Sequence, residues 1–134
     1  MSKTYNIFIS HAWDYNSDYY RLEDMLNNAL YFSWKNHSVP EHDALDTATD
    51  EELENALKNQ IRGTHIVLII AGMYYYHRKW IQKEIKIAQN MDKPIVAIKP
   101  WGSQKTPKEV EEAALEVVGW NTSSIVEAIR RHSK

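Results

Sequence analysis

The sequence predicts an α/β fold in which five parallel strands form a sheet covered by helices on both faces. Three observations lead to this prediction. Short apolar runs alternate five times with longer stretches of helical period, the order expected of a parallel sheet with crossover helices. The run from His65 to Ile70 is almost continuously apolar and β-branched, as in a strand buried on both faces. With 134 residues and no cysteine, the chain has the length of one domain and needs no disulfides to build a core.

The first part of the chain predicts two strands, one helix and a long loop. Tyr5 to Ile9 is β-branched and aromatic and is too short for a helix, so we expect a strand. Asp14 to Leu30 carries apolar residues at a 3.6-residue period, which predicts a helix with one apolar face. Tyr31 to Trp34 then fits a short second strand. Lys35 to Thr49 has no period and contains Pro40, which predicts a loop long enough to be functional.

The rest of the chain continues the alternation. Thr49 and Glu52 form a capping box, which predicts a helix that ends near Gly63 and is followed by the strand from His65 to Ile70. We expect the remaining elements in this order: helix Tyr74–Gln89, strand Lys93–Ile98, helix Pro107–Ala114 with Pro107 at its first position, strand Leu115–Trp120, and a final helix capped by Asn121 or Thr122. Five strands in such a chain favour the flavodoxin-like order 2-1-3-4-5. Its ligand crevice lies beyond the carboxyl ends of the first and third strands.

Composition and motifs exclude several classes of function. Sixteen Lys and Arg against eighteen Asp and Glu give a net charge of −2, which argues against binding to nucleic acid or anionic membrane. No apolar run has the length of a signal peptide core or a membrane span, so we expect a cytoplasmic protein. The four glycines form neither a dinucleotide fingerprint nor a P-loop. His37, His42, Asp43 and His11 match no common zinc spacing, and we expect no metal.

Glu84 stands out on the helix predicted from Tyr74 to Gln89. A surface glutamate usually has a basic residue three or four positions away. Here those positions are apolar or aromatic: Trp80, Ile81, Ile87 and Ala88. We therefore expect Glu84 on or beside the inward face, where burial perturbs the pKa of a carboxyl group. A plainer interpretation, in which Glu84 lies at the edge of the stripe and caps a backbone group or pairs with an arginine such as Arg62 or Arg78, stays open at this point.

Several segments resemble TIR domains. Tyr5 to His11 resembles the first conserved box of that family, and Trp80 to Ile85 resembles the W-x-x-x-E segment that carries the glutamate of NAD-cleaving members. Three further segments resemble the TIR-like subfamily (ThsB-type) of bacterial Thoeris anti-phage systems: Trp34–Pro40, Lys99–Gly102 and Gly119–Asn121. The resemblance covers essentially the whole chain. It implies that residues 1–134 form a single TIR-like domain with the flavodoxin-like sheet predicted above.

The resemblance implies an enzyme that cleaves the nicotinamide–ribose bond of NAD+, as a glycohydrolase or an ADP-ribosyl cyclase. Its product would be a cyclic ADP-ribose-type signal that is made on phage infection and activates a separate effector. Glu84 would be catalytic, and the substrate-binding residues would be Ser10, His11, Trp13, Asp46, Tyr74 and Trp80. NAD+ is then a substrate, and no cofactor is expected. The loop from Lys35 to Thr49 would serve as a lid.

The alternative is a non-catalytic TIR module that acts through protein–protein interaction, because fold alone does not give function. Self-association is left open under both hypotheses.

Overall fold

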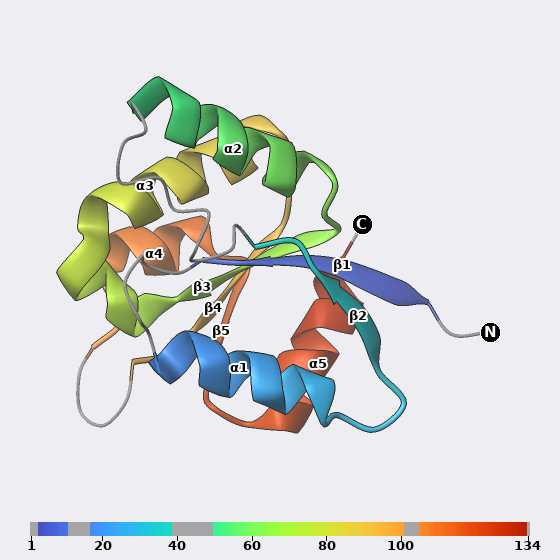
Figure 1. The fold of residues 1–134 in the computed structure, drawn as a ribbon. Helices are drawn as coiled ribbons and strands as arrows, with labels where there is room; N and C mark the ends of the chain where they lie inside the picture. The colour runs from blue at the N-terminus through green and yellow to red at the C-terminus, as the bar shows by residue number, and fades with distance from the viewer. Residues whose placement is uncertain (1–2, 11–16, 39–49, 101–104, 134) are drawn as a thin grey trace.

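The structure, a computed structural model, describes residues 3–10, 17–38, 50–100 and 105–133. In this part of the chain a single parallel sheet has the strand order β2-β1-β3-β4-β5, which confirms the predicted order (Figure 1). The strands are β1 (Thr4–Ile9), β2 (Ser33–Asn36), β3 (Ile66–Ile70), β4 (Ile95–Ile98) and β5 (Glu116–Val118). Since all neighbouring strands are parallel, their carboxyl ends lie at one edge of the sheet.

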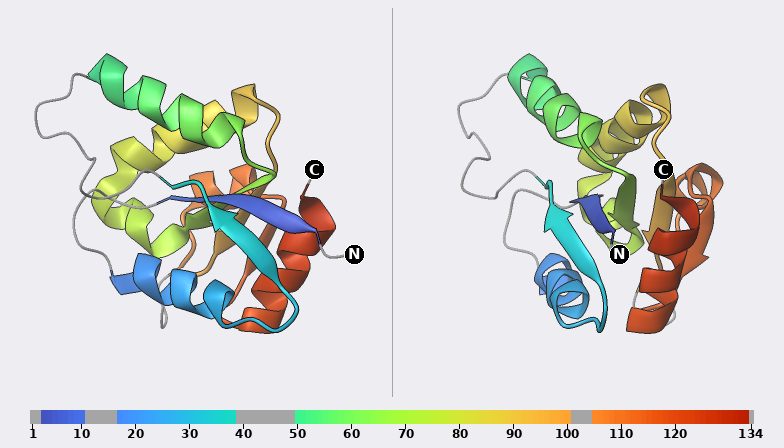
Figure 2. Two further views of the ribbon diagram at one scale, coloured as in Figure 1. Left: turned by 45° about the vertical axis from the view of Figure 1, so that its right-hand side comes forward. Right: turned by 90° about the vertical axis from the view of Figure 1, so that its right-hand side faces the viewer.

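The helices lie on both faces of the sheet (Figures 1 and 2). One face carries α1 (Ser17–Asn27) and α5 (Thr122–His132). The other carries α2 (Asp50–Arg62), α3 (Tyr74–Asn90) and α4 (Lys108–Ala113), and a short 3-10 turn, η2 (Ala71–Met73), leads from β3 into α3. None of the described helices is both long and apolar enough to cross a membrane.

Each strand divides its side chains between two separate cores. In β1, Ile7 and Ile9 pack with α1 and α5, whereas Phe8 between them packs with α2 and α3. Each of these three residues is at most 1% exposed to solvent. This alternation follows from the two-residue period of a strand. It explains why the inner strands read as continuous apolar runs.

The turn between α1 and β2 differs from the prediction. Helix α1 ends at Asn27 rather than Leu30, and β2 begins at Ser33 rather than Tyr31. Tyr31 has a φ of 56°, a left-handed conformation that fits neither a helix nor a strand. Residues 35 and 36, which were expected in the loop, therefore belong to β2, where they pair with β1.

Two helix starts are decided by local geometry. Pro107 is the N-cap of α4 rather than its first residue, because its ψ of 137° is extended. Asn121 caps α5, and its side chain accepts a hydrogen bond from the backbone N–H of Ser124 at 3.1 Å. Of the two caps that the sequence left open, the structure therefore selects Asn121. The predicted cap Thr49 lies outside the described residues.

Candidate functional site

Glu84 lies in the middle of α3, and its side chain is only 1% exposed. The sequence-based expectation of an inward position is therefore confirmed. Ile81, Ile85 and Ala88 of the same helix are buried in the core on this face of the sheet. Among the side chains that the structure describes, Glu84 is the one Asp, Glu, Lys, Arg or His that is buried. The other buried polar residues are Ser10, Ser38 and Thr64.

The carboxyl group of Glu84 is poorly satisfied. Its Oε2 is buried and has no hydrogen-bond partner among the described residues. Neither arginine of the plainer interpretation is paired with it: Arg62 donates to Asn59 at 3.2 Å, and the Arg78 guanidinium lies 5.8 Å from the ring centroid of Tyr74. Burial raises the pKa of Glu84 well above its ordinary value, because a carboxylate loses hydration there.

The serines at the end of β1 and β2 have partners, in contrast to Glu84. Ser10 directly follows β1, and its Oγ accepts a hydrogen bond from the backbone N–H of Ile70 at 3.2 Å. Ser38 follows β2, and its Oγ accepts from the N–H of Ile9 at 2.9 Å. Both hydroxyl groups thus join neighbouring strands at the carboxyl edge of the sheet. Binding of substrate by Ser10 stays a prediction.

Sequence reasoning did not single out Ser38 as a site residue. A local signal for it exists, because the Ser38 N–H donates to the side-chain oxygen of Asn36 at 2.9 Å, the two-residue spacing of an Asx turn. Ser38 thereby fixes the start of the segment that leads away from β2. That segment belongs to the loop predicted as a lid.

Tyr74 begins α3 and is turned towards α4. Its hydroxyl group makes a short contact with Glu109 of α4, and Gln82 donates to the same carboxylate at 3.0 Å. The hydrogen bond from Tyr74, and after it that from Gln82, lowers the pKa of Glu109. Tyr74 and Glu84 are ten residues apart, which is about 15 Å along a helix. The structure thus gives Tyr74 a role in joining α3 to α4, and its predicted contact with substrate stays a prediction.

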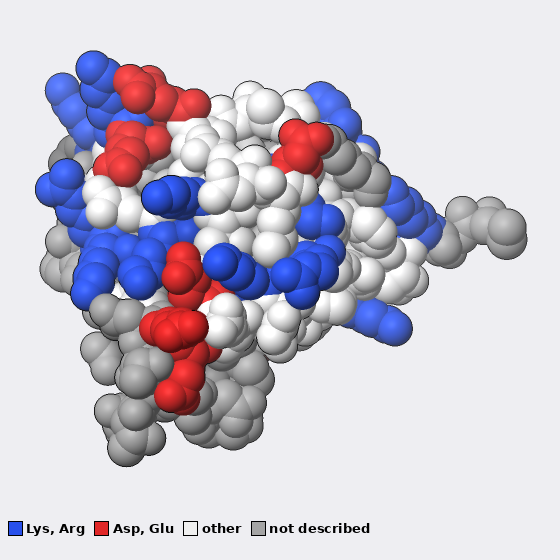
Figure 3. Space-filling view, turned by 90° about the horizontal axis from the view of Figure 1, so that it is seen from above, with Lys and Arg blue, Asp and Glu red and all other residues white. Residues whose placement is uncertain are grey.

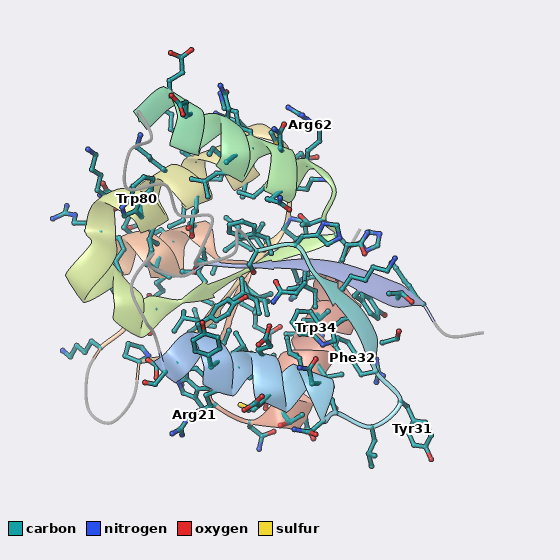
Figure 4. The ribbon with its side chains drawn as sticks, viewed as in Figure 1. Arg21, Tyr31, Phe32, Trp34, Arg62 and Trp80 are labelled. Carbon is teal, nitrogen blue, oxygen red and sulfur yellow. The ribbon has the colours of Figure 1, made fainter. Side chains whose placement is uncertain are left out.

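Trp80 lies one helical turn before Glu84 and therefore on a neighbouring part of the helix surface. The ring is half-buried against the core of this face, and the Lys83 ammonium is 5.8 Å from its centroid. Figure 4 shows Trp80 on α3, well separated from Arg62 at the end of α2. Of the predicted substrate-binding residues, Trp80 is the one described residue that the helix places next to Glu84.

The outer surface of α2 and α3 is charged, unlike the interior beneath it. Figure 3 shows lysine and arginine side chains spread over these helices with carboxylates among them. Lys58, Lys83, Lys86 and Glu54 line a hollow of about 290 Å³ between the two helices, and Glu84 is not among its lining residues. The carboxyl group of Glu84 is thus directed inward, away from this surface.

Three predicted site residues, His11, Trp13 and Asp46, lie outside the described residues, as do His42 and Asp43. Across the ranges that are described, no group of three or more His, Asp or Glu side chains could hold a metal ion.

The described part of the site offers one distinct chemical property. A buried carboxyl group without a hydrogen-bond donor binds a proton readily and, when ionised, strongly attracts a positive charge. The attraction is strong because apolar surroundings screen charge less than water does. Such a group suits a substrate that is positively charged or becomes so as it reacts.

Comparison with known proteins is consistent with this fold. Residues 8–105, well over half of the chain, match the family model described as Thoeris protein ThsB, TIR-like domain. The matched segment includes the end of β1, the strands β2 to β4 and Glu84. A search of curated proteins found no match.

Proposed function

Because this chain belongs to the family of TIR-like domains of the Thoeris protein ThsB, we propose that it cleaves the nicotinamide–ribose bond of NAD+. The product would be a cyclic ADP-ribose-type signal that activates a separate effector during phage infection. Membership of the family supports the role in anti-phage defence. The observation that carries the proposed chemistry is the buried carboxyl group of Glu84, whose Oε2 has no hydrogen-bond partner among the described residues.

The reaction requires stabilisation of positive charge rather than an acid. When the bond between the ribose C1′ and the pyridinium nitrogen breaks, its electron pair moves to the nitrogen, and nicotinamide leaves as a neutral molecule. The ribose is left with oxocarbenium character, as in glycoside hydrolysis. A carboxylate held near the ribose stabilises this charge, and the stabilisation is larger in a site from which water is excluded. Glu84 is the described residue that meets this requirement.

Binding of substrate would shift the protonation equilibrium of Glu84. Burial raises the pKa of Glu84 and so favours its neutral form in the free protein. The pyridinium ring of NAD+ brings a positive charge, which favours the carboxylate. Binding of NAD+ therefore shifts Glu84 towards the carboxylate form that the reaction requires.

The identity of the product depends on what captures the ribosyl cation. Attack by water gives ADP-ribose, whereas attack by a hydroxyl group or ring nitrogen of the same molecule gives a cyclic product. Exclusion of water favours the second outcome. The apolar core on this face of the sheet, with Ile81 and Ile85 beside Glu84 in α3, is suited to such exclusion.

Incubation of the purified protein with NAD+, alone and in lysate from infected cells, tests this proposal directly. Nicotinamide and the nucleotide products would be separated and identified by mass spectrometry. We expect Glu84→Gln to lower turnover by about 100-fold or more, because the neutral amide cannot stabilise the developing charge. Glu112→Gln, which changes an exposed carboxylate of α4, serves as the matched control.

Full turnover by Glu84→Gln would contradict the assignment of Glu84. No loss of NAD+ under any condition would instead favour the non-catalytic interaction module.

A further inference from the structure

The hollow between α2 and α3 gathers positive charge. Three lysines line its volume of about 290 Å³: Lys58 from α2 and Lys83 and Lys86 from α3. None of the three forms an ion pair with a described residue. The carboxylate of Glu54 also lines the hollow, which leaves an excess of two positive charges among its described lining residues. This excess stands against a net charge of −2 for the whole chain, and it makes the hollow attractive to an anion.

Two of these lysines are partly packed rather than fully extended into water. Lys58 and Lys83 are only partly exposed, whereas Lys86 is exposed. The ammonium group of Lys83 also lies 5.8 Å from the ring centroid of Trp80. A lysine whose apolar stem packs against the protein keeps its charge near one place. Such a charge loses less conformational freedom when it binds a ligand.

The rest of the hollow is not charged. Its lining includes Ile87, which is 4% exposed, and Met91, which is half-buried, and Asn90 adds a side-chain amide. Figure 3 shows the face that carries α2 and α3, where lysine and arginine side chains stand beside uncharged surface. An apolar wall with a few polar groups is typical of a small-molecule site, and the volume is near the lower end of their range, about 300 Å³. A ligand that fits must therefore combine an anionic group with a flat, largely apolar one.

We propose that this hollow binds a phosphorylated nucleoside, with its phosphate among the three lysines and its base against Ile87 and Met91. Lysine binds phosphate as a point charge, and three such charges match a phosphate dianion. The amide of Asn90 and the carboxylate of Glu54 can pair with the polar edge of the base and with the ribose hydroxyl groups. A long polyanion is a poorer fit, because binding of nucleic acid depends on contacts to many phosphates and the chain as a whole is negative.

The proposed nucleotide site is separate from the site at Glu84. Lys83 directly precedes Glu84 in α3, but successive side chains on a helix point about 100° apart. Glu84 is 1% exposed and does not line the hollow. Asn90 ends α3 and Met91 leads on towards β4, so the hollow extends towards the amino edge of the sheet. The predicted substrate crevice lies at the carboxyl edge. The proposal therefore does not rest on cleavage of NAD+.

Isothermal titration calorimetry of the whole chain with adenosine monophosphate tests the proposal. Adenosine and inorganic phosphate are titrated in parallel, because each supplies only one half of the expected contacts. We expect adenosine monophosphate to bind about 10-fold more tightly than either probe. Since the lysines act by charge, an increase in NaCl from about 0.05 M to about 0.5 M should weaken its binding several-fold.

Variants on the two helices locate the site. The double variant Lys58→Ala, Lys86→Ala should raise the dissociation constant for adenosine monophosphate by about 10-fold or more. Alanine is the best helix former, so the unfolding temperature of this variant should be little changed. Lys108→Ala removes an exposed lysine of α4 outside the hollow and should bind as the wild type does. Glu84→Gln should also keep the affinity, whatever its effect on NAD+.

Three results would overturn the proposal. The first is no binding of adenosine monophosphate to the wild type at concentrations up to about 10 mM. The second is unchanged affinity in the double lysine variant, because the nucleotide would then occupy another surface. The third is equal affinity for inorganic phosphate, which would show that the hollow recognises charge alone. Association of the same lysines with an acidic protein would not compensate for any of these results.

Discussion

The two faces of the sheet differ in one respect on which the proposed function depends. On the face covered by α1 and α5, every buried residue of the core is apolar except Tyr19, whose hydroxyl group accepts a hydrogen bond from Asn36 at 2.8 Å. On the face covered by α2, α3 and α4, an equally apolar core surrounds a helix that carries Glu84. The fold needs both cores, but nothing in the packing requires a carboxyl group in either.

Two carboxyl groups on the second face sharpen this contrast. Glu109 is exposed, and the hydroxyl of Tyr74 and then the amide of Gln82 lower its pKa by hydrogen bonding. Glu84 is buried, and loss of hydration raises its pKa. Glu109 is thus a charged, hydrogen-bonded glutamate, whereas Glu84 is a glutamate that is poorly solvated. An unpaired buried carboxyl group lowers stability, which is typical of functional sites.

We expect the largest effect on stability from a cavity in the core that α1 and α5 form with the sheet, on the opposite face from Glu84. Leu22 of α1 is completely buried, and Leu22→Ala should lower the free energy of unfolding by about 2–5 kcal/mol. Urea unfolding would measure this loss. Cleavage of NAD+ per folded molecule should be unchanged, because Leu22 packs on the opposite side of the sheet from Glu84. A parallel fall in activity of the folded variant would show that the two faces are not independent.

Replacement of Glu84 should stabilise the protein. The pKa of Glu84 is raised in the folded state, so its contribution to stability is complete below the ordinary pKa and is lost as the pH rises through the folded value. Glu84→Gln cannot ionise and avoids this loss. We expect a gain at neutral pH of about 1.4 kcal/mol for each unit by which burial raises the pKa of Glu84, up to the working pH. The gain should shrink below about pH 4.5.

Thermal unfolding at several pH values would measure the stability of Glu84→Gln. Glu112→Gln at the exposed end of an ion pair with Lys108 should change stability by less than about 0.5 kcal/mol at any pH. A pH-independent difference between the wild type and Glu84→Gln would contradict the assigned cause.

The pH dependence of catalysis should follow the same group. If Glu84 must be ionised, kcat/KM for NAD+ should rise about 10-fold per pH unit below its pKa in the free protein and become constant above it. Steady-state kinetics between mildly acidic and alkaline pH would show this limb. A flat profile would mean that ionisation of Glu84 is not required.

The smallest effect is expected at Tyr74. Tyr74→Phe removes the hydroxyl contact with Glu109 and should cost about 0.5–1 kcal/mol, because the carboxylate is exposed to water. The pKa of Glu109 should move back towards its ordinary value. KM for NAD+ should stay the same if Tyr74 serves only to join α3 to α4. An increase in KM would support the sequence-based prediction that Tyr74 binds substrate.

Much of the fold could be predicted because its signals are local. Continuous apolar runs mark strands covered on both faces, and helical periods mark the elements between them. The inward position of Glu84 could be predicted for the same reason, since the residues three and four positions away are within one helix. The partners of side chains could not be predicted. Tyr74 meets Glu109 across 35 residues, and Arg130 meets Tyr31 across 99.

The sequence by itself therefore determined the alternation of strands and helices and the presence of one glutamate on an inward helical stripe, and it favoured the strand order that the structure confirms. Only the tertiary structure decided that no arginine reaches Glu84 and that its Oε2 lacks a donor among the described residues. It also decided that Lys58, Lys83 and Lys86, from two helices, line one hollow. Periodicity reports which side of an element is buried, whereas pairing depends on which elements the chain brings together, and that information is not local.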